Sequence, residues 1–302
     1  MVKAVEQDKS LGHLLSQGHT ACPGCGEALA VRLVLRAAGR NVILVNPTGC
    51  VEIFTSNYPE SAWEVPWIHS LFENTAAVAS GVEAALRVTG RLDQVKVIAQ
   101  GGDGATFDIG FGAISGMWER GHDILCVCYD NEAYMNTGVQ RSGATPHYAR
   151  TTTSPPGRAS LGNPLPKKDL PQIAVAHGLP YVATATVGYP LDLDKKVKRA
   201  LSIRGPKYIQ IHVPCPLGWQ HDPSLSIEIA RLAVSTGLYP LFEIESGVLK
   251  ARKIPKKVPV EEYLKPQGRF QHLFNTEEGR RAIEEIQGVA DRNIERYGLM
   301  SK

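Results

Sequence analysis

Short apolar, β-branched runs alternate with helical patterns along the first two thirds of this chain. Runs that are apolar on both faces are typical of parallel strands buried between two layers of helices. Strands that alternate with helices indicate a doubly wound parallel sheet, so the sequence predicts an α/β fold. The strands are expected at residues 41–46, 95–100, 123–129, 181–186 and 207–213, and the helices at 27–38, 70–86, 108–120, 169–177 and 191–203.

Three segments depart from this alternation. Residues 51–69 are rich in aromatic residues and proline, so we expect them to be irregular. The polar stretch 131–167 is expected to be a long loop, and long loops in compact domains often carry function. Beyond residue 223 the pattern weakens, although a charged helix is expected at 276–296. We therefore divide the chain into a main domain, residues 1–223, and a C-terminal arm or subunit-contact extension, residues 224–302.

Composition excludes several classes of protein. Hydrophobic residues make up 43% of the chain and charged residues 21%, which is ordinary for a folded soluble protein. The net charge of +3 is too small to indicate a nucleic-acid partner by itself. No apolar run approaches the roughly 20 residues of a membrane-spanning helix. Residues 1–10 lack the apolar core of a secretory signal, so we expect a cytoplasmic protein with neither nucleic acid nor membrane as a partner.

A glycine-rich turn, Gly101-Gly102-Asp103-Gly104, joins a predicted strand to a predicted helix. Ligands of open α/β folds bind at this edge of the sheet, and free backbone N–H groups there favour phosphate. The turn is not a dinucleotide fingerprint, because Phe107 stands where the third glycine is expected. A carboxylate beside a phosphate requires a cation between them. Mg²⁺ takes oxygen ligands from both, so the turn predicts a magnesium–phosphate site.

A second oxygen donor for this cation is expected from Asn131, at the end of the next predicted strand. The 26 residues between Gly104 and Asn131 match one strand–helix–strand unit, which brings two strand ends together. A tight turn alone would explain most strings of this composition. The pairing with Asn131 favours a cofactor site, and Gly102-Asp103-Gly104 with Asn131 resembles the thiamin diphosphate-binding motif.

Four of the six cysteines lie in predicted loops next to strand or helix ends. Cys22 and Cys25 form a Cys-Pro-Gly-Cys string, whereas Cys50 and Cys215 each follow a predicted strand. Four thiolates suit either a tetrahedral zinc ion or an iron–sulfur cluster, and the spacing does not choose between them. Unrelated buried thiols are a further interpretation of Cys50 and Cys215 taken singly.

The two constellations together resemble the beta subunit of pyruvate:ferredoxin oxidoreductase, a thiamin-dependent 2-oxoacid oxidoreductase. The resemblance extends over nearly the whole chain and is strongest at residues 19–26, 48–74, 101–110, 129–145 and 214–219. It implies the thiamin diphosphate-binding fold, with thiamin diphosphate, Mg²⁺ and a [4Fe–4S] cluster as cofactors. Carried over residue by residue, it implies that the cluster is ligated by Cys22, Cys25, Cys50 and Cys215, and Mg²⁺ by Asp103, Asn131 and the backbone carbonyl of Ala133. It implies that the thiamin cofactor is contacted by Thr48, Gly49, Gly102, Gly104 and Thr137. It also places Asn136 near the thiazolium ring as a catalytic residue.

The resemblance also implies a reaction. The thiamin ring acts as the electron sink for decarboxylation of a 2-oxoacid, the acyl group passes to coenzyme A, and the cluster accepts the electrons before ferredoxin does. Pyruvate is the favoured substrate, with oxalate (independent of coenzyme A), 2-oxoisovalerate or another 2-oxoacid as alternatives. A non-redox thiamin enzyme, which would not need the cysteines, and a zinc-binding module with four cysteines are the alternatives outside this family.

One component of a thiamin enzyme is not assigned to this chain. The glutamate that activates the aminopyrimidine is expected from a partner alpha subunit, because Glu52, Glu64 and Glu73 are more simply surface or loop charges. The cysteines are too few for further clusters, so a ferredoxin-like subunit or external ferredoxin is also implied. We therefore expect the isolated chain to be inactive, and we expect Thr48 and Cys50 to lie between the thiamin and cluster sites.

Other conspicuous side chains have simpler interpretations. His69 is expected to be a hydrogen-bonded packing residue rather than a proton-transfer group. Arg141 would meet a substrate carboxylate or a coenzyme A phosphate, or form a salt bridge within its loop. Cys126 and Cys128, which share one face of a strand, are expected in the core. Core or interface positions are expected for Trp63, Trp67 and Trp219. The basic run at residues 250–257 is expected on a solvated or subunit-contacting surface.

Overall fold

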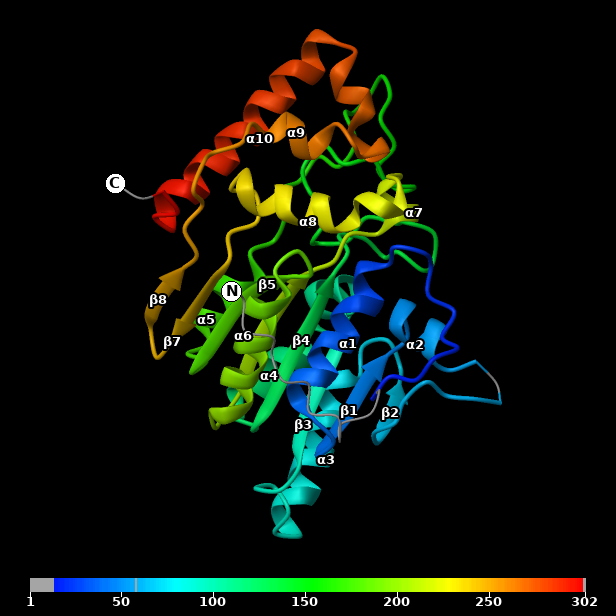
Figure 1. Cartoon of the computed structure of the whole chain (residues 1–302), viewed down its shortest axis with the longest axis vertical. Coiled ribbons are helices and arrows are strands. Elements are labelled where there is room, and N and C mark those ends of the chain that lie inside the picture. Colours follow the sequence, from blue (N-terminus) through cyan, green and yellow to red (C-terminus); the bar gives the residue numbers. More distant parts are fainter. Residues whose placement is uncertain (1–13, 58, 301–302) are drawn as a thin grey trace, which may run out of the picture.

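The structure is a computed structural model that describes residues 14–57 and 59–300. Its centre is an eight-stranded sheet in the order β2-β1-β3-β4-β6-β5-β7-β8 (Figure 1). The strands are β1 (Val42–Pro47), β2 (Trp67–Ser70), β3 (Lys96–Gly102), β4 (Ile124–Asp130), β5 (Tyr181–Thr186), β6 (Lys207–His212), β7 (Phe242–Glu245) and β8 (Val248–Ala251). The helices are α1 (Gly26–Ala38), α2 (Cys50–Thr55), α3 (Thr75–Val88), the π-helical turn η2 (Gly104–Ile109), α4 (Phe111–Glu119), α5 (Leu170–Ala176), α6 (Pro190–Ser202), α7 (Pro216–Trp219), the 3₁₀ turn η3 (Pro223–Leu225), α8 (Ser226–Ser235), α9 (Val260–Leu264), the 3₁₀ segment η4 (Gly268–Phe274) and α10 (Glu277–Arg296).

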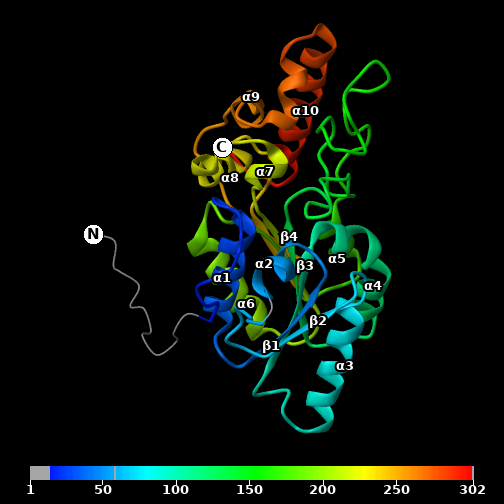
Figure 2. The same cartoon turned by 90° about the vertical axis from the view of Figure 1, so that its right-hand side faces the viewer.

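The first six strands pair in parallel, and helices cover both faces of the sheet, so the predicted doubly wound α/β fold is confirmed. Figure 2 shows α1 and α6 on one face and α3, α4 and α5 on the other. The strand order reverses between β1 and β3, because the chain first adds β2 on one side of β1 and then continues from β3 in the opposite direction. Ligands of such sheets bind outside the carboxyl ends of the strands at this reversal.

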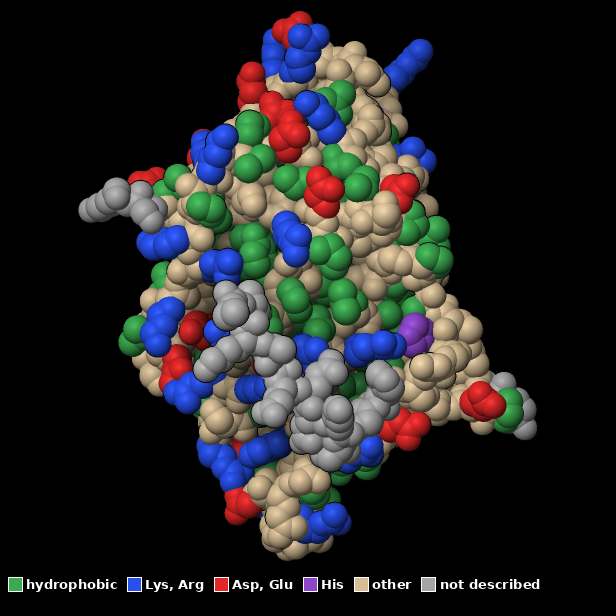
Figure 3. All heavy atoms as spheres, in the orientation of Figure 1, with side chains coloured by type: hydrophobic (Ala, Val, Ile, Leu, Met, Phe, Trp, Pro, Cys, Tyr) green, Lys and Arg blue, Asp and Glu red, His purple; other side chains and the backbone are tan. Residues whose placement is uncertain are grey.

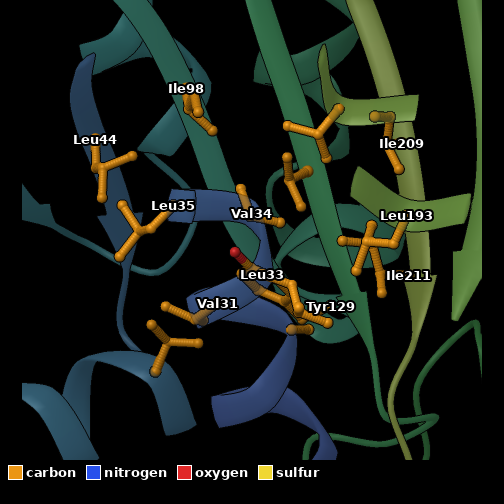
Figure 4. Packing of buried hydrophobic residues seen from close by; sticks show 14 of the residues in the cluster. Val31, Leu33, Val34, Leu35, Leu44, Ile98, Tyr129, Leu193, Ile209 and Ile211 are labelled. Carbon is orange, nitrogen blue, oxygen red and sulfur yellow. The ribbon is translucent and has the colours of Figure 1, made fainter. Parts of the chain in front are cut away.

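The two layers of helices enclose separate parts of the core. On one face Val31 and Val34 of α1 pack against Leu44 and Ile98 of the sheet, beside Leu193 of α6 (Figure 4). On the opposite face the core includes Cys126 and Cys128, both almost fully buried among side chains of α3 and α4. The expectation that these two cysteines are core residues is confirmed.

The C-terminal segment is joined to the main sheet. Strand β7 pairs antiparallel with β5, and β8 pairs antiparallel with β7. Helices α8, α9 and α10 enclose a second apolar core with β7, which also includes Trp219. In Figure 1 these helices form the yellow to red end of the molecule, beyond the carboxyl ends of the strands. The division of the chain after residue 223 stays a prediction, but this segment shares both a sheet and a core with what precedes it.

The structure differs from the sequence expectations most between residues 50 and 75. The segment expected to be irregular contains α2 and the parallel edge strand β2, in which Trp67 lies opposite Leu44 of β1. The following helix begins only at Thr75, because Ser70 still pairs with Pro47 in the sheet. The helix expected at 108–120 is divided into η2 and α4. The long loop predicted at 131–167 and the helix predicted at 276–296 are both confirmed.

The surface carries both signs of charge. Figure 3 shows Lys and Arg side chains interspersed with Asp and Glu over the face that it presents. None of the helices in the described ranges is both long and apolar enough to cross a membrane. The polar start of the chain, interpreted above as lacking a secretory signal, lies outside the described residues.

Candidate functional site

A cavity of about 340 Å³ opens at the carboxyl ends of β1, β3 and β4, where the strand order reverses. Its walls come from the loop after β1, the segment after β2 (residues 71–73), the turn after β3 and the loop after β4, with one contribution from the start of α1. The cavity therefore brings together most of the residues that the sequence analysis places around a cofactor. These are Thr48, Gly49, Cys50, Gly102, Gly104, Asn131, Ala133, Asn136 and Thr137.

The glycines of the turn permit close backbone approach. A Cβ atom on Gly104 would lie 2.6 Å from the ring of Tyr134, and one on Gly101 would lie 2.9 Å from the side chain of Pro47. Gly102 faces open space instead, since the atom nearest to its Cβ position is the carbonyl oxygen of Tyr129 at 3.9 Å. The turn thus packs tightly on two sides and leaves room on the third, where the cavity lies.

The side chain of Asp103, within this turn, is fully buried and does not line the cavity. Its Oδ1 accepts hydrogen bonds from the backbone N–H groups of Asn131 and Glu132, both at 3.2 Å, and its Oδ2 accepts one from the hydroxyl of Ser142. Burial, followed by the charge of the neighbouring carboxylate of Asp130, raises the pKa of Asp103 well above its usual range. Ionisation of both carboxyl groups therefore requires positive charge nearby.

The oxygen atoms beside Asp103 suit a magnesium ion. The side-chain oxygens Oδ1 of Asn131 and Oδ1 of Asp130 are buried and have no hydrogen-bond partner within the protein. Buried polar atoms are rarely left without a partner, and a hard cation in the cavity would satisfy Oδ1 of Asn131, which lines it. Ala133 is also buried and lines the cavity. Of the predicted ligands, Asn131 and Ala133 thus line the cavity, whereas Asp103 adjoins them through its hydrogen bonds to the loop and does not line it.

Two of the cysteine segments pack against each other directly. The backbone N–H of Gly26 donates to the carbonyl of Pro214 at 3.1 Å, and a Cβ on Gly26 would lie 2.8 Å from that oxygen. This contact brings the loop of Cys22 and Cys25 next to Cys215. The sulfur atoms of Cys25 and Cys215 each accept a hydrogen bond from the backbone N–H three residues further along, at 3.5 and 3.4 Å.

The thiols also influence one another's ionisation. Burial raises the pKa of Cys25 to about 12 and that of Cys215 to about 11, with a further increase from the charge of the buried carboxylate of Glu27. Burial raises the pKa of Cys50 as well, and the charges of Cys215 and Cys25 add to this effect. The exposed Cys22 contributes in the same way to Cys215. The four thiols are therefore neighbours, and the buried thiols of Cys25, Cys50 and Cys215 resist ionisation.

Cys50 belongs both to the residues that line the cavity and to the group of neighbouring thiols. It lines the cavity, and a hydrogen bond from Asn136 lowers its pKa in part. Thr48 lines the cavity beside it. Within residues 14–57 and 59–300, no three His, Cys, Asp or Glu side chains converge closely enough to hold a single metal ion.

The sequence analysis missed Glu27, a buried carboxyl group in the first turn of α1. Glu27 lines the cavity, and its Oε2 accepts a hydrogen bond from Nδ2 of Asn131 at 3.3 Å. Burial raises the pKa of Glu27 to about 8. Its position directly after the Cys-Pro-Gly-Cys-Gly string was the available signal. Of the glutamates weighed instead, Glu73 lines the cavity but is exposed, and Glu52 and Glu64 do not line it.

The remaining marked residues take part in ordinary contacts. The Nε2 atom of His69 lies 3.2 Å from the hydroxyl of Thr48, and its ring stacks on Trp67, which stacks on Trp63. The Nε–H of Arg141 donates to Asn163 at 3.2 Å, so this arginine is held by its own loop.

The fold and the cavity define a thiamin-binding protein. Residues 47–211 match the family described as "Thiamine pyrophosphate enzyme, C-terminal TPP binding domain", a synonym of thiamin diphosphate. The solved structure of a 2-oxoglutarate:ferredoxin oxidoreductase from Magnetococcus marinus covers 71% of this chain, and the match covers 77% of that chain, with a TM-score of 0.56 and 24% identity. This likeness supports the fold.

Curated relatives are more similar in sequence. Pyruvate synthase subunit PorB of Methanosarcina barkeri is 55% identical over 94% of this chain and 97% of its own length. The PorB subunit of Thermotoga maritima is 44% identical over 93% and 90%, and the ketoisovalerate oxidoreductase subunit VorB of Pyrococcus furiosus is 49% identical over 85% of each chain. The chain therefore belongs to the PorB family of thiamine pyrophosphate enzymes.

We expect Gly104→Ala to weaken thiamin diphosphate binding by at least about tenfold, because the added methyl group would displace the ring of Tyr134 from the cavity wall. Gly112→Ala is the matched control, since a Cβ there meets no atom within 4 Å. The measurement is calorimetric titration of the assembled complex with the cofactor and Mg²⁺. Equal affinities for the two variants would contradict the proposed role of the turn.

A second prediction concerns His212, which is fully buried at the end of β6. Burial lowers its pKa to about 3, although the charge of Glu132 acts in the opposite direction. The folded protein therefore holds the ring neutral, while the unfolded chain takes up a proton near pH 6.5. We expect this contribution to stability to be lost as the pH falls from about 6.5 towards 3, by on the order of a few kcal/mol.

His212→Gln removes the titrating group. Urea unfolding at a series of pH values should give a difference in unfolding free energy between wild type and variant that shrinks as the pH falls. A difference that stays constant with pH would contradict the prediction.

Proposed function

We propose that this chain is the thiamin-binding and cluster-bearing subunit of a cytoplasmic pyruvate:ferredoxin oxidoreductase. The complex would decarboxylate pyruvate oxidatively, transfer the acetyl group to coenzyme A and pass the electrons through a [4Fe–4S] cluster to ferredoxin. The observation that carries this proposal is a shared wall. Cys50 lines the thiamin cavity and also lies among the thiols of Cys25 and Cys215, so electrons have only a short distance to travel.

Each group of residues has a distinct task in this proposal. The bound thiamin diphosphate supplies the electron sink for decarboxylation. Oxygen atoms of Asp103, Asn131 and Ala133 would hold the Mg²⁺ ion of its diphosphate, while the glycine turn allows the phosphates close to the backbone. Asn136 would orient the reacting end of the cavity, which it lines together with Cys50.

A [4Fe–4S] cluster suits the cysteines better than zinc does. Each thiolate of such a cluster binds a different iron, so the four sulfur atoms need not converge on one point. The backbone N–H groups that point at the sulfurs of Cys25 and Cys215 are of the kind that tune the potential of a cluster. Ligation by Cys22, Cys25, Cys50 and Cys215 is therefore part of the proposal.

The substrate is proposed from the relatives. The similarity to PorB subunits of pyruvate synthases favours pyruvate as the substrate of this complex. The 49% identity to a ketoisovalerate oxidoreductase subunit makes 2-oxoisovalerate the second candidate. A partner alpha subunit would complete the pocket and supply the activating glutamate, and a ferredoxin-like subunit or external ferredoxin would receive the electrons.

Assay of the complex, purified anaerobically with its partner subunits, tests this function. We expect reduction of ferredoxin that requires pyruvate, coenzyme A and thiamin diphosphate, slower reduction with 2-oxoisovalerate, and no turnover by the isolated chain. Reduction by oxalate without coenzyme A would assign the alternative substrate, and absence of ferredoxin reduction with every 2-oxoacid would overturn the proposal.

Replacement of Cys25 or Cys215 by serine should lower the iron and sulfide content of the complex by one cluster, reduce the brown absorbance accordingly and abolish ferredoxin reduction. Cys126→Ala is the control, because Cys126 is a core residue on β4 and does not belong to the proposed ligand set. Metal analysis and visible spectroscopy measure the loss. Zinc in place of iron in the wild-type complex, or full iron content in the serine variants, would contradict the ligand assignment.

A further inference from the structure

A buried arginine of the C-terminal segment contacts both the Asn131–Ala133 loop and the turn that follows Cys215. Arg269, in η4, is 3% exposed, which is rare for an arginine unless its charge is paired. Its Nη2 lies 2.6 Å from Oε2 of Glu132, and its guanidinium lies 3.8 Å above the ring of Trp219. Neither contact involves the cavity, which Arg269 does not line.

The first contact is with the loop Asn131–Ala133, which carries two of the proposed magnesium ligands. Glu132 lies between Asn131 and Ala133, and its backbone φ is +69°, a value that residues other than glycine seldom adopt. Its backbone N–H donates to Oδ1 of Asp103 at 3.2 Å. The side chain of Glu132 is the anchor, because its carboxylate is held by Arg269 and by Lys167 at 2.8 Å.

The second contact reaches the cysteine segment. The indole N–H of Trp219 donates to the backbone carbonyl of Asn131 at 2.8 Å. Trp219 ends α7, the single turn that begins directly after Cys215, and its backbone N–H donates to the carbonyl of Cys215 at 2.9 Å. One guanidinium therefore contacts the neighbour of a proposed magnesium ligand and the turn that carries a proposed cluster ligand.

The surrounding charges leave little tolerance for the loss of Arg269. Two buried carboxylates, Asp130 and Glu132, share two cations, the buried Arg269 and the partly buried Lys167. Without Arg269, Lys167 alone would compensate two buried negative charges, and removal of one partner from a buried pair is strongly unfavourable. The Nε–H of Arg269 also donates to Gln267 at 2.9 Å, which fixes the plane of the guanidinium.

We infer that Arg269 is a positioning residue that holds the Asn131–Ala133 loop and the Cys215 turn in a fixed relation, so that the C-terminal segment sets the geometry between the thiamin and cluster sites. This inference rests on the proposed function for the identity of the two groups. It assigns to residues 224–302 a role inside the site, in addition to any contact with a partner subunit.

The test uses the assembled complex and the variants Arg269→Gln, Arg269→Lys and Glu132→Gln. Arg296→Gln is the matched control, because Arg296 is also in the C-terminal segment, pairs with Asp169 at 3.2 Å and lies 5.3 Å from the ring of Tyr297, but is exposed and forms neither a hydrogen bond nor an ion pair with residues 131–133. We expect the affinity for Mn²⁺, followed by electron paramagnetic resonance (EPR) in the presence of thiamin diphosphate, to fall 10- to 100-fold in Arg269→Gln and to stay unchanged in Arg296→Gln.

The other variants separate positioning from a folding defect. Arg269→Lys keeps the charge and should restore part of the Mn²⁺ affinity, while Glu132→Gln combined with Arg269→Gln should cost less than the product of the two single effects, since the pair acts as a unit. Strictly multiplicative effects, or unchanged Mn²⁺ affinity in a folded Arg269→Gln complex, would overturn the inference.

The reduced cluster supplies the second readout. We expect its EPR signal to change in Arg269→Gln, through Trp219 and Cys215, and to be unaltered in Arg296→Gln. An altered Mn²⁺ affinity with an unaltered cluster signal would overturn the link between the two sites. A wild-type complex that binds neither Mn²⁺ with thiamin diphosphate nor iron would instead overturn the proposed function, so the two failures are distinguishable.

Discussion

The buried carboxylate of Asp103 is the group on which the rest of the site depends. It joins the end of β3 to the loop after β4, because one of its oxygens receives the backbone N–H groups of Asn131 and Glu132. A second carboxylate, Asp130, lies close enough to raise its pKa further. Such an arrangement is unfavourable in an empty protein interior, and it becomes favourable when a divalent cation and fixed positive side chains are near. Lys167, which pairs with Asp130, supplies part of this positive charge, and the proposed Mg²⁺ would supply the rest.

One loop carries residues of both proposed cofactor sites. The loop after β1 supplies both Thr48 at the cavity and Cys50 among the thiols, so the two proposed cofactors share one short segment of backbone. The strand order makes this possible, because β1 lies directly beside β3 at the reversal of the sheet. A ligand held at the end of β3 is therefore next to whatever the loop after β1 binds.

Much of this arrangement was predictable from local sequence. The strands follow from apolar runs, and the Gly102–Gly104 turn and Asn131 follow from the spacing of one strand–helix–strand unit. Glu27 was missed because its importance depends on burial against Asn131, 104 residues away. Ser142 and Arg269 were missed for the same reason, since a polar loop residue and an arginine in a weakly patterned tail have no local signature. The edge strand β2 was missed because pairing with β1 overrides its irregular composition.

The C-terminal segment contains more than its composition indicates. Its charged helix and basic run favour a solvated or subunit-contacting surface, and between and before them β7 extends the sheet and Arg269 lies against Trp219 in the interior. Its apolar core includes Trp219, whose indole N–H holds the carbonyl of Asn131. Packing of this segment and geometry of the Asn131–Ala133 loop are therefore not separable, since a shift in one moves a hydrogen-bond partner of the other. The proposed function would gain from this coupling, because motion of either loop would alter the path of electrons between the two proposed cofactors.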